Sequence, residues 1–321
     1  MATIREKILS LKKYMDSRII GQQDLVKKLL ITLLADGHAL VEGAPGLAKT
    51  KAIKTLAQSI NAKYNRIQFT PDLLPSDITG SEIYVADKGE FEFRAGPVFA
   101  NLVLADEINR APAKVQSALL EAMAERQVSI GGKRYALPPL FMVMATQNPI
   151  EQEGTYNLPE AQLDRFLMYI KIDHPNAESE RQILKLVRGE FNHTLSEQDK
   201  VTLSIEDILA ARKEVQVVHM SEGVEEYLIQ LVVATRRPDK YSKTLAGQVL
   251  YGASPRATIA LDRAAKINAW IEGRDYVTPE DIHAVVYDIL RHRIILSFEA
   301  QAEGITTDSV IEELLKTVPL P

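Results

Sequence analysis

Hydrophobic positions in the first half of the chain alternate between short apolar runs and longer amphipathic stretches. The apolar runs predict five strands, over residues 38–41, 64–69, 102–105, 140–145 and 166–172. Residues 25–34 and 113–125 place apolar side chains at helical spacing, and Gly37 ends the first of these helices. Strands that alternate with helices are typical of a parallel α/β sheet. We therefore predict an α/β fold built on a parallel five-stranded sheet.

Two further stretches have the pattern of β-hairpins, and the predicted sheet needs neither of them. The first runs from Ile83 to Phe93 around a turn at 86–89. The second runs from Gln127 to Leu137 around Gly131-Gly132, and a two-residue Gly-Gly loop between strand-like runs is a strong hairpin signal. Because loops so often carry function, the hairpins are either interaction elements or plain surface elaborations.

The second half of the chain has a different pattern, in which helices dominate. Apolar stripes predict helices over residues 177–187, 205–215, 224–235, 257–271 and 282–291. Ser221 is a predicted N-cap, and Thr278-Pro279 supplies an N-cap followed by proline at the first helical position. We predict an α/β domain over residues 1–192 and an all-α domain over 193–321, joined by a short linker near 191–203.

The segment from Val41 to Thr50 joins the first predicted strand to a helical pattern over 51–60. This is the setting that a phosphate-binding loop requires. Glycines let backbone N–H groups turn toward a polyphosphate, and the following helix points its positive end at the same charge. Ala48 stands where the strict pattern has glycine, so a glycine-rich turn before an ordinary helix is the alternative. The loop residues predicted to surround the phosphates are Gly43, Ala44, Pro45, Gly46, Leu47 and Ala48.

The composition of this loop makes two more predictions. Lys49 is expected to reach the β- and γ-phosphates, and the hydroxyl of Thr50 to ligate Mg²⁺. Ala48 is expected to have a negative φ, because a side chain with a Cβ atom resists the left-handed region.

Adjacent carboxylates end the predicted strand at 102–105. Open α/β sheets bind ligands at the carboxyl edge of their strands. There Asp106 would hold Mg²⁺ through water, and Glu107 would polarise the water that attacks the γ-phosphate. The alternative is a helix N-terminus that carries acidic residues. The next strand leads to Asn148, an amide suited to the γ-phosphate and the attacking water, although Asn-Pro is also a common turn.

Composition and charge limit the classes of protein to which this chain can belong. A chain of 321 residues is long enough for two domains, and 46% apolar with 25% charged residues is ordinary for a globular protein. The net charge of −5 argues against broad nucleic-acid binding. Without cysteine there is no disulfide, thiol nucleophile or thiolate metal site. No signal sequence or membrane-length apolar run is present, so we expect no membrane insertion and a cytoplasmic location.

Five segments together resemble the MoxR family of AAA+ ATPases. They are Gly-Ala-Pro-Gly-Leu-Ala-Lys-Thr (43–50), Ala-Asp-Glu-Ile-Asn-Arg-Ala-Pro (105–112), Ala-Thr-Gln-Asn-Pro (145–149), Leu-Pro-Glu-Ala-Gln-Leu-Asp-Arg-Phe (158–166) and Ser-Pro-Arg-Ala (254–257). The likeness covers the whole chain. The alanine at position 48, directly before the lysine, also resembles the pattern of this family. The resemblance implies a P-loop AAA+ core followed by an all-α lid domain.

The resemblance also implies roles for the motifs. Lys49 and Thr50 match Walker A, Asp106 and Glu107 match Walker B, and Asn148 matches sensor 1. The hairpins at 83–93 and 127–137 match the helix-2 and pre-sensor-1 inserts. The segment Ile20-Gly21-Gln22 matches the lining of the adenine pocket.

Three arginines have competing interpretations. Arg165 matches the arginine finger that reaches a neighbouring subunit's nucleotide, but it has acidic neighbours, Asp164 and Glu160, with which it could pair. Arg256 matches sensor 2. It stands at the start of a predicted helix, where the helix dipole disfavours a positive charge. Because the arginine does not stabilise the helix there, its position favours a functional role. Arg110 fits either a subunit-interface contact or a local salt bridge.

The resemblance implies a Mg²⁺-dependent ATPase that binds ATP and works as a ring, expected to be a hexamer. Its expected clients are proteins, with proteins that carry a von Willebrand factor type A domain as expected partners. A DNA-translocating motor is the alternative, for which Lys133 and Arg134 in the second hairpin are the suggestive charges. A scaffold that binds ATP without turnover ranks last, because every catalytic position is occupied.

Overall fold

The computed structural model describes residues 2–149, 154–191 and 201–321. The chain divides into two compact units, Met1–Phe166 with Ile170–Leu209, and Leu167–Tyr169 with Ala210–Pro321. The predicted domain boundary at residue 192 and much of the predicted linker lie outside the described residues, and that boundary stays a prediction.

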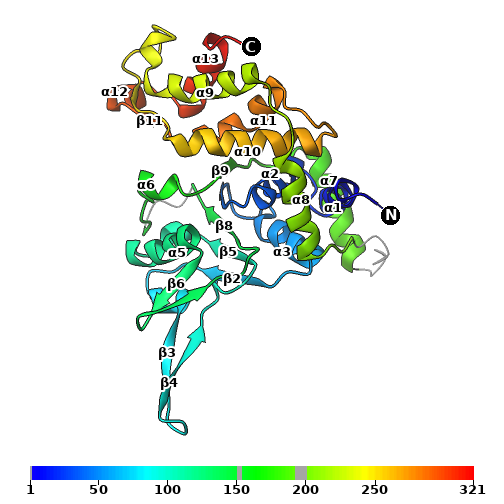
Figure 1. Cartoon of the computed structure of the whole chain (residues 1–321), viewed down its shortest axis with the longest axis vertical. Helices are drawn as coiled ribbons and strands as arrows, with labels where there is room; N and C mark the ends of the chain where they lie inside the picture. Colours follow the sequence, from blue (N-terminus) through cyan, green and yellow to red (C-terminus); the bar gives the residue numbers. More distant parts are fainter. Residues whose placement is uncertain (1, 150–153, 192–200) are drawn as a thin grey trace. The chain divides into compact units, whose positions relative to one another are not determined.

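A five-stranded sheet forms the centre of the first unit, in the order β2-β5-β8-β1-β9 (Figure 1). The pairs β2–β5, β5–β8 and β1–β8 are parallel. All five strands were predicted, with each end within two residues of its observed place. The strands are β1 (Ala39–Glu42), β2 (Tyr64–Gln68), β5 (Leu102–Asp106), β8 (Met142–Gln147) and β9 (Met168–Lys171).

Burial explains why these runs form strands. In β5 the residues Leu102–Ala105 are fully buried, as are Met142–Ala145 in the neighbouring strand β8. Such continuous apolar runs belong to strands that are covered on both faces. The edge strand β2 differs, because exposed Arg66 and Gln68 alternate with buried Ile67. The polar face of β2 thus runs along the rim of the sheet.

Helices cover the sheet, and Figure 1 shows α3 and α5 on either side of it. Helix α5 coincides with the predicted range, and its apolar stripe buries Val115, Leu119 and Met123. The helical segments of this unit are α1 (Ile4–Arg18), α2 (Gln23–Leu34), α3 (Lys49–Ser59), α4 (Pro75–Thr79), η1 (Ile108–Arg110), α5 (Ala113–Glu125), α6 (Glu160–Leu163), α7 (Ala177–Phe191) and the start of α8 (Ile205–Gln216).

Both predicted hairpins are present as two-stranded antiparallel sheets. Strand β3 (Gly80–Val85) pairs with β4 (Glu90–Ala95), and β6 (Gln127–Ile130) pairs with β7 (Lys133–Ala136). Gly131 and Gly132 both have positive φ, which is why this turn uses two glycines. The two hairpins touch, because the ring of Phe93 stacks on that of Tyr135 with centroids 3.9 Å apart.

The second unit is mainly helical, as predicted. Helices α9 and α11 begin at the predicted caps, Ser221 and Thr278, and the single tryptophan, Trp270, is buried in α10. A two-stranded ribbon, β10 (Val249–Tyr251) with β11 (Ile295–Leu296), was too short to be predicted. The helical segments are α9 (Glu222–Arg236), η3 (Pro238–Lys240), α10 (Pro255–Ile271), α11 (Pro279–Leu290), α12 (Phe298–Ala302) and α13 (Thr307–Thr317).

Candidate functional site

The loop from Gly43 to Ala48 connects β1 to α3, as predicted for a phosphate-binding loop. Gly43 has no room for a side chain, because a Cβ atom there would lie 2.4 Å from Cγ1 and 2.9 Å from the carbonyl oxygen of Ile172. Gly46 has φ of 84°, which glycine adopts without strain. The two glycines therefore serve different needs, close packing against the chain after β9 and a left-handed turn.

Ala48 contradicts the prediction of a negative φ. Its φ is 59° and its ψ is 15°, which is the left-handed helical conformation. It is also the N-cap residue of α3, and its carbonyl oxygen accepts a hydrogen bond of 2.9 Å from the N–H of Ala52. A left-handed residue with a Cβ atom costs about 1–2 kcal/mol. Closing the loop onto the start of α3 outweighs this cost, so the loop is strained where the strict pattern has glycine.

Lys49 is folded back over the loop that it follows. Its Nζ donates a hydrogen bond of 2.6 Å to the carbonyl oxygen of Gly43. Partial burial lowers the pKa of Lys49, although the negative charges of Asp106, Glu107 and Glu42 act in the opposite direction. The ammonium group thus lies within the field of both carboxylates at the end of β5.

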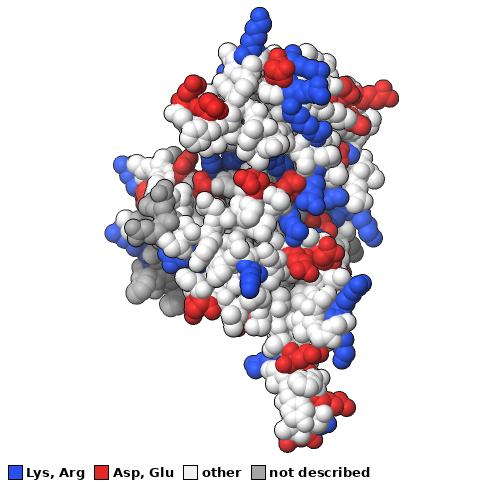
Figure 2. All heavy atoms as spheres, turned by 90° about the vertical axis from the view of Figure 1, so that its left-hand side faces the viewer, with Lys and Arg blue, Asp and Glu red and all other residues white. Residues whose placement is uncertain are grey.

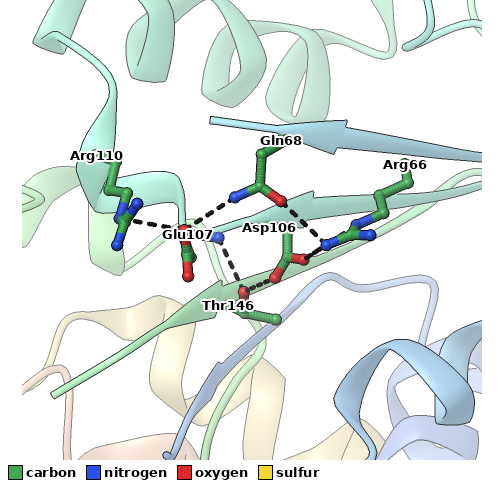
Figure 3. Close-up of polar contacts among 6 residues, drawn as sticks. All are labelled: Arg66, Gln68, Asp106, Glu107, Arg110 and Thr146. Atoms are coloured by element: carbon green, nitrogen blue, oxygen red, sulfur yellow. Dashed lines mark hydrogen bonds and ion pairs between the residues drawn. The ribbon is translucent and has the colours of Figure 1, made fainter. Parts of the chain in front are cut away.

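Asp106 and Glu107 are held by the neighbouring strand β8 (Figure 3). The hydroxyl of Thr146 donates to Oδ1 of Asp106 at 2.6 Å and accepts from the N–H of Glu107 at 2.9 Å. Glu107 has φ of 55° and ψ of 50°, a second strained left-handed residue at this site. Strain of this kind persists only where the surroundings fix it, and it gathers at functional sites. It directs Glu107 away from the course of the strand.

Strand β2 contributes two side chains that the sequence reasoning missed. Arg66 contacts Oδ2 of Asp106 through Nη2 at 2.6 Å and Nε at 3.1 Å. Its Nη2 also donates to Oε1 of Gln68 at 3.0 Å, and Nε2 of Gln68 donates to Oε2 of Glu107 at 2.9 Å (Figure 3). The available signal was the alternation of Arg66 and Gln68 about buried Ile67, which puts both on one face of the strand.

Arg110, for which two interpretations were open, forms the local salt bridge. Its Nε lies 3.1 Å from Oε2 of Glu107, the same oxygen that accepts from Gln68. The candidate base is therefore held through one carboxylate oxygen by a charged and a neutral donor.

A cavity of about 420 Å³ brings most of the predicted residues together. It is lined by Pro45, Gly46, Leu47, Ala48, Lys49, Thr50, Lys51, Arg66, Asp106, Glu107 and Asn148. Buried Asn148 also lines a neighbouring polar cavity of about 480 Å³, together with Glu42, Asn109, Gln147, Pro149, Thr155 and Asn157. The loop, the lysine, both carboxylates and the amide thus face one space, the size of a small-ligand site.

The donor set fits a phosphate-bound Mg²⁺. A hydroxyl from Thr50 and a carboxylate from Asp106 face the cavity, and hard oxygen ligands are what Mg²⁺ prefers. Among the described residues, no group of three or more His, Cys, Asp or Glu could hold a metal ion. Phosphate oxygens and water would complete the coordination of a Mg²⁺ held by Thr50 and Asp106. Nothing lies within 4 Å of the position that a Cβ atom would take at Gly46, so the loop backbone is open there.

Six predicted residues do not line either cavity: Gly43 and Ala44 of the loop, Ile20, Gly21, Arg165 and Arg256. Gly21 packs against the segment after β9, where a Cβ atom would lie 2.9 Å from Cβ of Pro175, and Ile20 precedes it. Arg165 is exposed, and its Nη1 donates to the carbonyl oxygen of Leu120 at 2.7 Å. Arg256 is an exposed residue of the second unit, in the first turn of α10 after the cap Ser254. The roles of these residues stay predictions.

No helix in the described parts of the chain has both the length and the apolar character that a membrane crossing requires. Two family models match the sequence. Residues 38–168 match the ATPase family associated with various cellular activities (AAA), and residues 244–314 match the AAA lid domain.

Several proteins are similar over nearly the whole chain. Chaperone MoxR1 of Mycobacterium tuberculosis is 46% identical over 320 residues, which span 99% of this chain and 82% of that protein. Protein YeaC of Bacillus subtilis, itself uncharacterised, is 45% identical over 94% of this chain and 91% of its own. Protein MoxR of Paracoccus denitrificans is 34% identical over 94% and 93%.

A solved structure extends the likeness to three dimensions. The crystal structure of a candidate ATPase from Cytophaga hutchinsonii superposes with a TM-score of 0.91 at 50% identity, and covers 99% of this chain and 96% of its own. The sheet, the phosphate loop and the mainly helical second unit are those of a P-loop AAA+ core and its lid. With 46% identity to Chaperone MoxR1 along nearly its full length, the chain belongs to the MoxR family of AAA+ ATPases.

Proposed function

We propose that this protein is a Mg²⁺-dependent ATPase of the MoxR type that uses ATP hydrolysis to remodel protein clients. One observation carries the proposal: Lys49, Asp106, Glu107 and Asn148 face a single cavity beside a glycine-bearing loop. A phosphate chain bound there would meet a cation, a metal-binding carboxylate, a candidate base and an amide. Those are the parts that phosphoryl transfer to water requires.

The residues divide the work by chemistry and position. Lys49 and the loop backbone bind the β- and γ-phosphates, so Lys49 exchanges the carbonyl oxygen of Gly43 for phosphate oxygens. Thr50 and Asp106 would hold Mg²⁺, which neutralises phosphate charge when bound. Glu107 accepts the proton of the attacking water, and Asn148 orients that water and the γ-phosphate.

Glu107 needs a change in its surroundings to act as a base. Its Oε2 accepts from Gln68 and faces Arg110, and both contacts restrain the carboxylate. Hydrolysis therefore requires water to reach Oε1 or requires Oε2 to be released. The side chain is 26% exposed, so water has access to it.

In this proposal the protein works as a ring, with a hexamer as the expected form. A neighbouring subunit then supplies the positive charge that stabilises the transition state. Arg165 does not line the cavity of its own chain, and its exposed guanidinium is bonded to the carbonyl oxygen of Leu120. An arginine that reaches a neighbour's nucleotide accelerates hydrolysis by about 10³–10⁵-fold. Arg256 is assigned the sensor role of the lid, and Ile20 with Gly21 the adenine pocket.

The client-facing element in this proposal is the β3–β4 hairpin, which projects at the bottom of Figures 1 and 2. Tyr84 and Phe91 are 56% and 64% exposed, and their rings lie 5.3 Å apart, centroid to centroid. Exposed aromatic side chains are favoured in protein recognition. One full-length relative is named a chaperone, which supports protein clients; partners with a von Willebrand factor type A domain and a cytoplasmic location stay predictions.

The DNA-motor alternative has less support. Acidic and basic side chains mix on the projecting hairpin in Figure 2, whereas DNA binding favours a basic field. Lys133 and Arg134 on β7 form no such field by themselves, and the net charge is −5. DNA binding that weakens steeply with added salt would revive this alternative; no binding at low salt would remove it.

The proposal is tested by comparing the wild-type chain with Lys49→Ala. Wild-type protein should bind a fluorescent ADP analogue and release phosphate from ATP when Mg²⁺ is present. Lys49→Ala should bind at least about tenfold more weakly, since a buried charge-assisted contact is worth more than about 1.4 kcal/mol. Lys54→Ala, an exposed lysine on the same helix α3 that does not line the cavity, is the matched control. Wild-type protein without nucleotide binding would overturn the proposal.

A further inference from the structure

Arg66 contacts Asp106, the carboxylate that would hold Mg²⁺ in the proposed function. Two of its nitrogens contact Oδ2 of Asp106, at 2.6 and 3.1 Å, and the guanidinium faces the nucleotide-sized cavity. The side chain of Asp106 is only 13% exposed, whereas that of Arg66 is 50% exposed. Arg66 is thus the partner that water can reach and that has room to leave.

Both oxygens of Asp106 are occupied in this arrangement. Oδ1 accepts from the hydroxyl of Thr146, and Oδ2 accepts from Arg66 (Figure 3). Thr146 is fixed in turn by the N–H of Glu107 and lies within the buried strand β8. A cation that binds Asp106 must therefore compete with Arg66 rather than with Thr146. An arginine keeps its charge under all ordinary conditions, so deprotonation cannot remove this competitor.

We propose that Arg66 is a positioning residue that serves as the counter-ion of Asp106 when no metal is bound, and that Mg²⁺ must displace it. This inference rests on the proposed function. The guanidinium orients the carboxylate, and by repelling a divalent cation it raises the Mg²⁺ concentration that nucleotide binding requires.

The same arginine connects the metal-binding carboxylate to the candidate base. Nη2 of Arg66 donates to Oε1 of Gln68, and Nε2 of Gln68 donates to Oε2 of Glu107. When Arg66 leaves Asp106, Gln68 loses the donor that fixes its amide. Binding of Mg²⁺ to Asp106 is therefore expected to weaken the hydrogen bond from Gln68 to Glu107. Metal binding and release of the base are linked in this way.

The test measures how binding of a fluorescent ADP analogue depends on free Mg²⁺, in wild type, R66Q, D106N and the double variant. R66Q should reach half-saturation at about fivefold lower Mg²⁺, the size expected for one partly exposed ion pair. In the D106N background, R66Q should shift it by less than about twofold, because the competition acts through Asp106. R94Q on exposed β4 removes the same charge elsewhere and is the matched control.

Three results would overturn the inference. They are an unchanged Mg²⁺ requirement in R66Q, a higher requirement, or an equal shift with and without Asp106. A wild-type chain that binds no ADP analogue at any Mg²⁺ concentration would overturn the proposed function as well. R66K, which keeps the charge but has a single donor nitrogen, should change the Mg²⁺ requirement less than R66Q does. Arg66→Met, which keeps the aliphatic stem, makes the same comparison if R66Q loses its helical circular-dichroism signal.

Discussion

Gln68 donates a hydrogen bond of 2.9 Å from its Nε2 to Oε2 of Glu107, across the β2–β5 strand pair. The register of this pair puts Gln68 opposite Asp106, one residue before Glu107. Because Glu107 follows the strand in a left-handed conformation, its carboxylate turns toward the polar face of β2 instead of continuing the strand. The candidate base is thus held by its neighbouring strand.

Replacing Gln68 with leucine should release this hold. One hydrogen bond to a charged acceptor contributes about 1 kcal/mol or more, so we expect basal ATP hydrolysis to rise about two- to fivefold. The measurement is phosphate release at saturating ATP, with nucleotide affinity determined in parallel. A rate at least tenfold lower at unchanged affinity would instead mean that Gln68 holds Glu107 in its working position.

Ala48 offers a test of the strained loop. Ala48→Gly should raise the free energy of unfolding by up to about 1 kcal/mol, because relief of the left-handed strain exceeds the entropy that glycine adds to the unfolded chain. Ala48→Val should destabilise the chain and weaken nucleotide binding, since a β-branched residue resists this conformation more strongly. Denaturant unfolding with and without nucleotide measures both. A valine variant as stable as wild type would contradict the left-handed assignment.

Local signals made most of the fold predictable. Apolar runs such as 102–105 marked the buried strands, the Gly131-Gly132 pair marked a hairpin, and Thr278 with Pro279 marked the start of α11. Each signal depends on residues that are close in sequence, so no tertiary contact was needed to recognise it. The carboxylates and the loop of the site were found in the same way.

Contacts that depend on strand register could not be predicted. Arg66 reaches Asp106 only because β2 pairs with β5 in one particular register, and no local pattern contains that pairing. A local salt bridge was one of the two interpretations of Arg110, but its partner was not predicted, because the contact with Glu107 depends on the left-handed turn of that residue. The prediction of a negative φ for Ala48 was wrong for a related reason. Closure of the loop requires the left-handed conformation there, although alanine alone disfavours it.

The second unit contains a buried ion pair whose loss should be costly. The side chain of Asp281 is fully buried and accepts from Nη1 and Nη2 of Arg274 at 2.6 Å, from Asn268, and from Thr278. Removing one partner of such a pair leaves an unpaired charge, so Asp281→Asn should destabilise this unit by about 2–3 kcal/mol, allowing for the partial exposure of Arg274. Fluorescence of buried Trp270 reports the unfolding. Glu312→Gln, in an exposed pair with Lys316 in the same unit, should leave the stability nearly unchanged.

This ion pair also predicts a pH dependence. Burial raises the pKa of Asp281, but the hydrogen bonds from Arg274, Thr278 and Asn268 outweigh burial and lower the pKa overall. A lowered pKa contributes stability above the unfolded value of about 4, and this stability is lost as the pH falls through the folded value. The difference between wild type and Asp281→Asn should therefore be constant near neutral pH and shrink below about pH 4. A difference that persists at lower pH would contradict this assignment.

The proposed ring predicts that two inactive variants restore activity when mixed. Arg165→Ala keeps an intact phosphate loop, and Lys49→Ala keeps an intact arginine. If Arg165 acts on a neighbour's nucleotide, mixed assemblies should recover part of the wild-type ATPase rate. Phosphate release across a series of mixing ratios measures this. Failure at every ratio, with assembly shown intact by light scattering, would argue against a finger that acts between subunits.

The most direct test of the central claim is the ATPase rate of Glu107→Gln. Glutamine keeps the size and the hydrogen-bonding capacity of the side chain but cannot accept the proton of the attacking water. Removal of a general base lowers the rate by about 10²–10⁴-fold. We therefore predict that Glu107→Gln binds ATP at least as tightly as wild type and loses phosphate release to this extent. Hydrolysis at the wild-type rate would contradict the account.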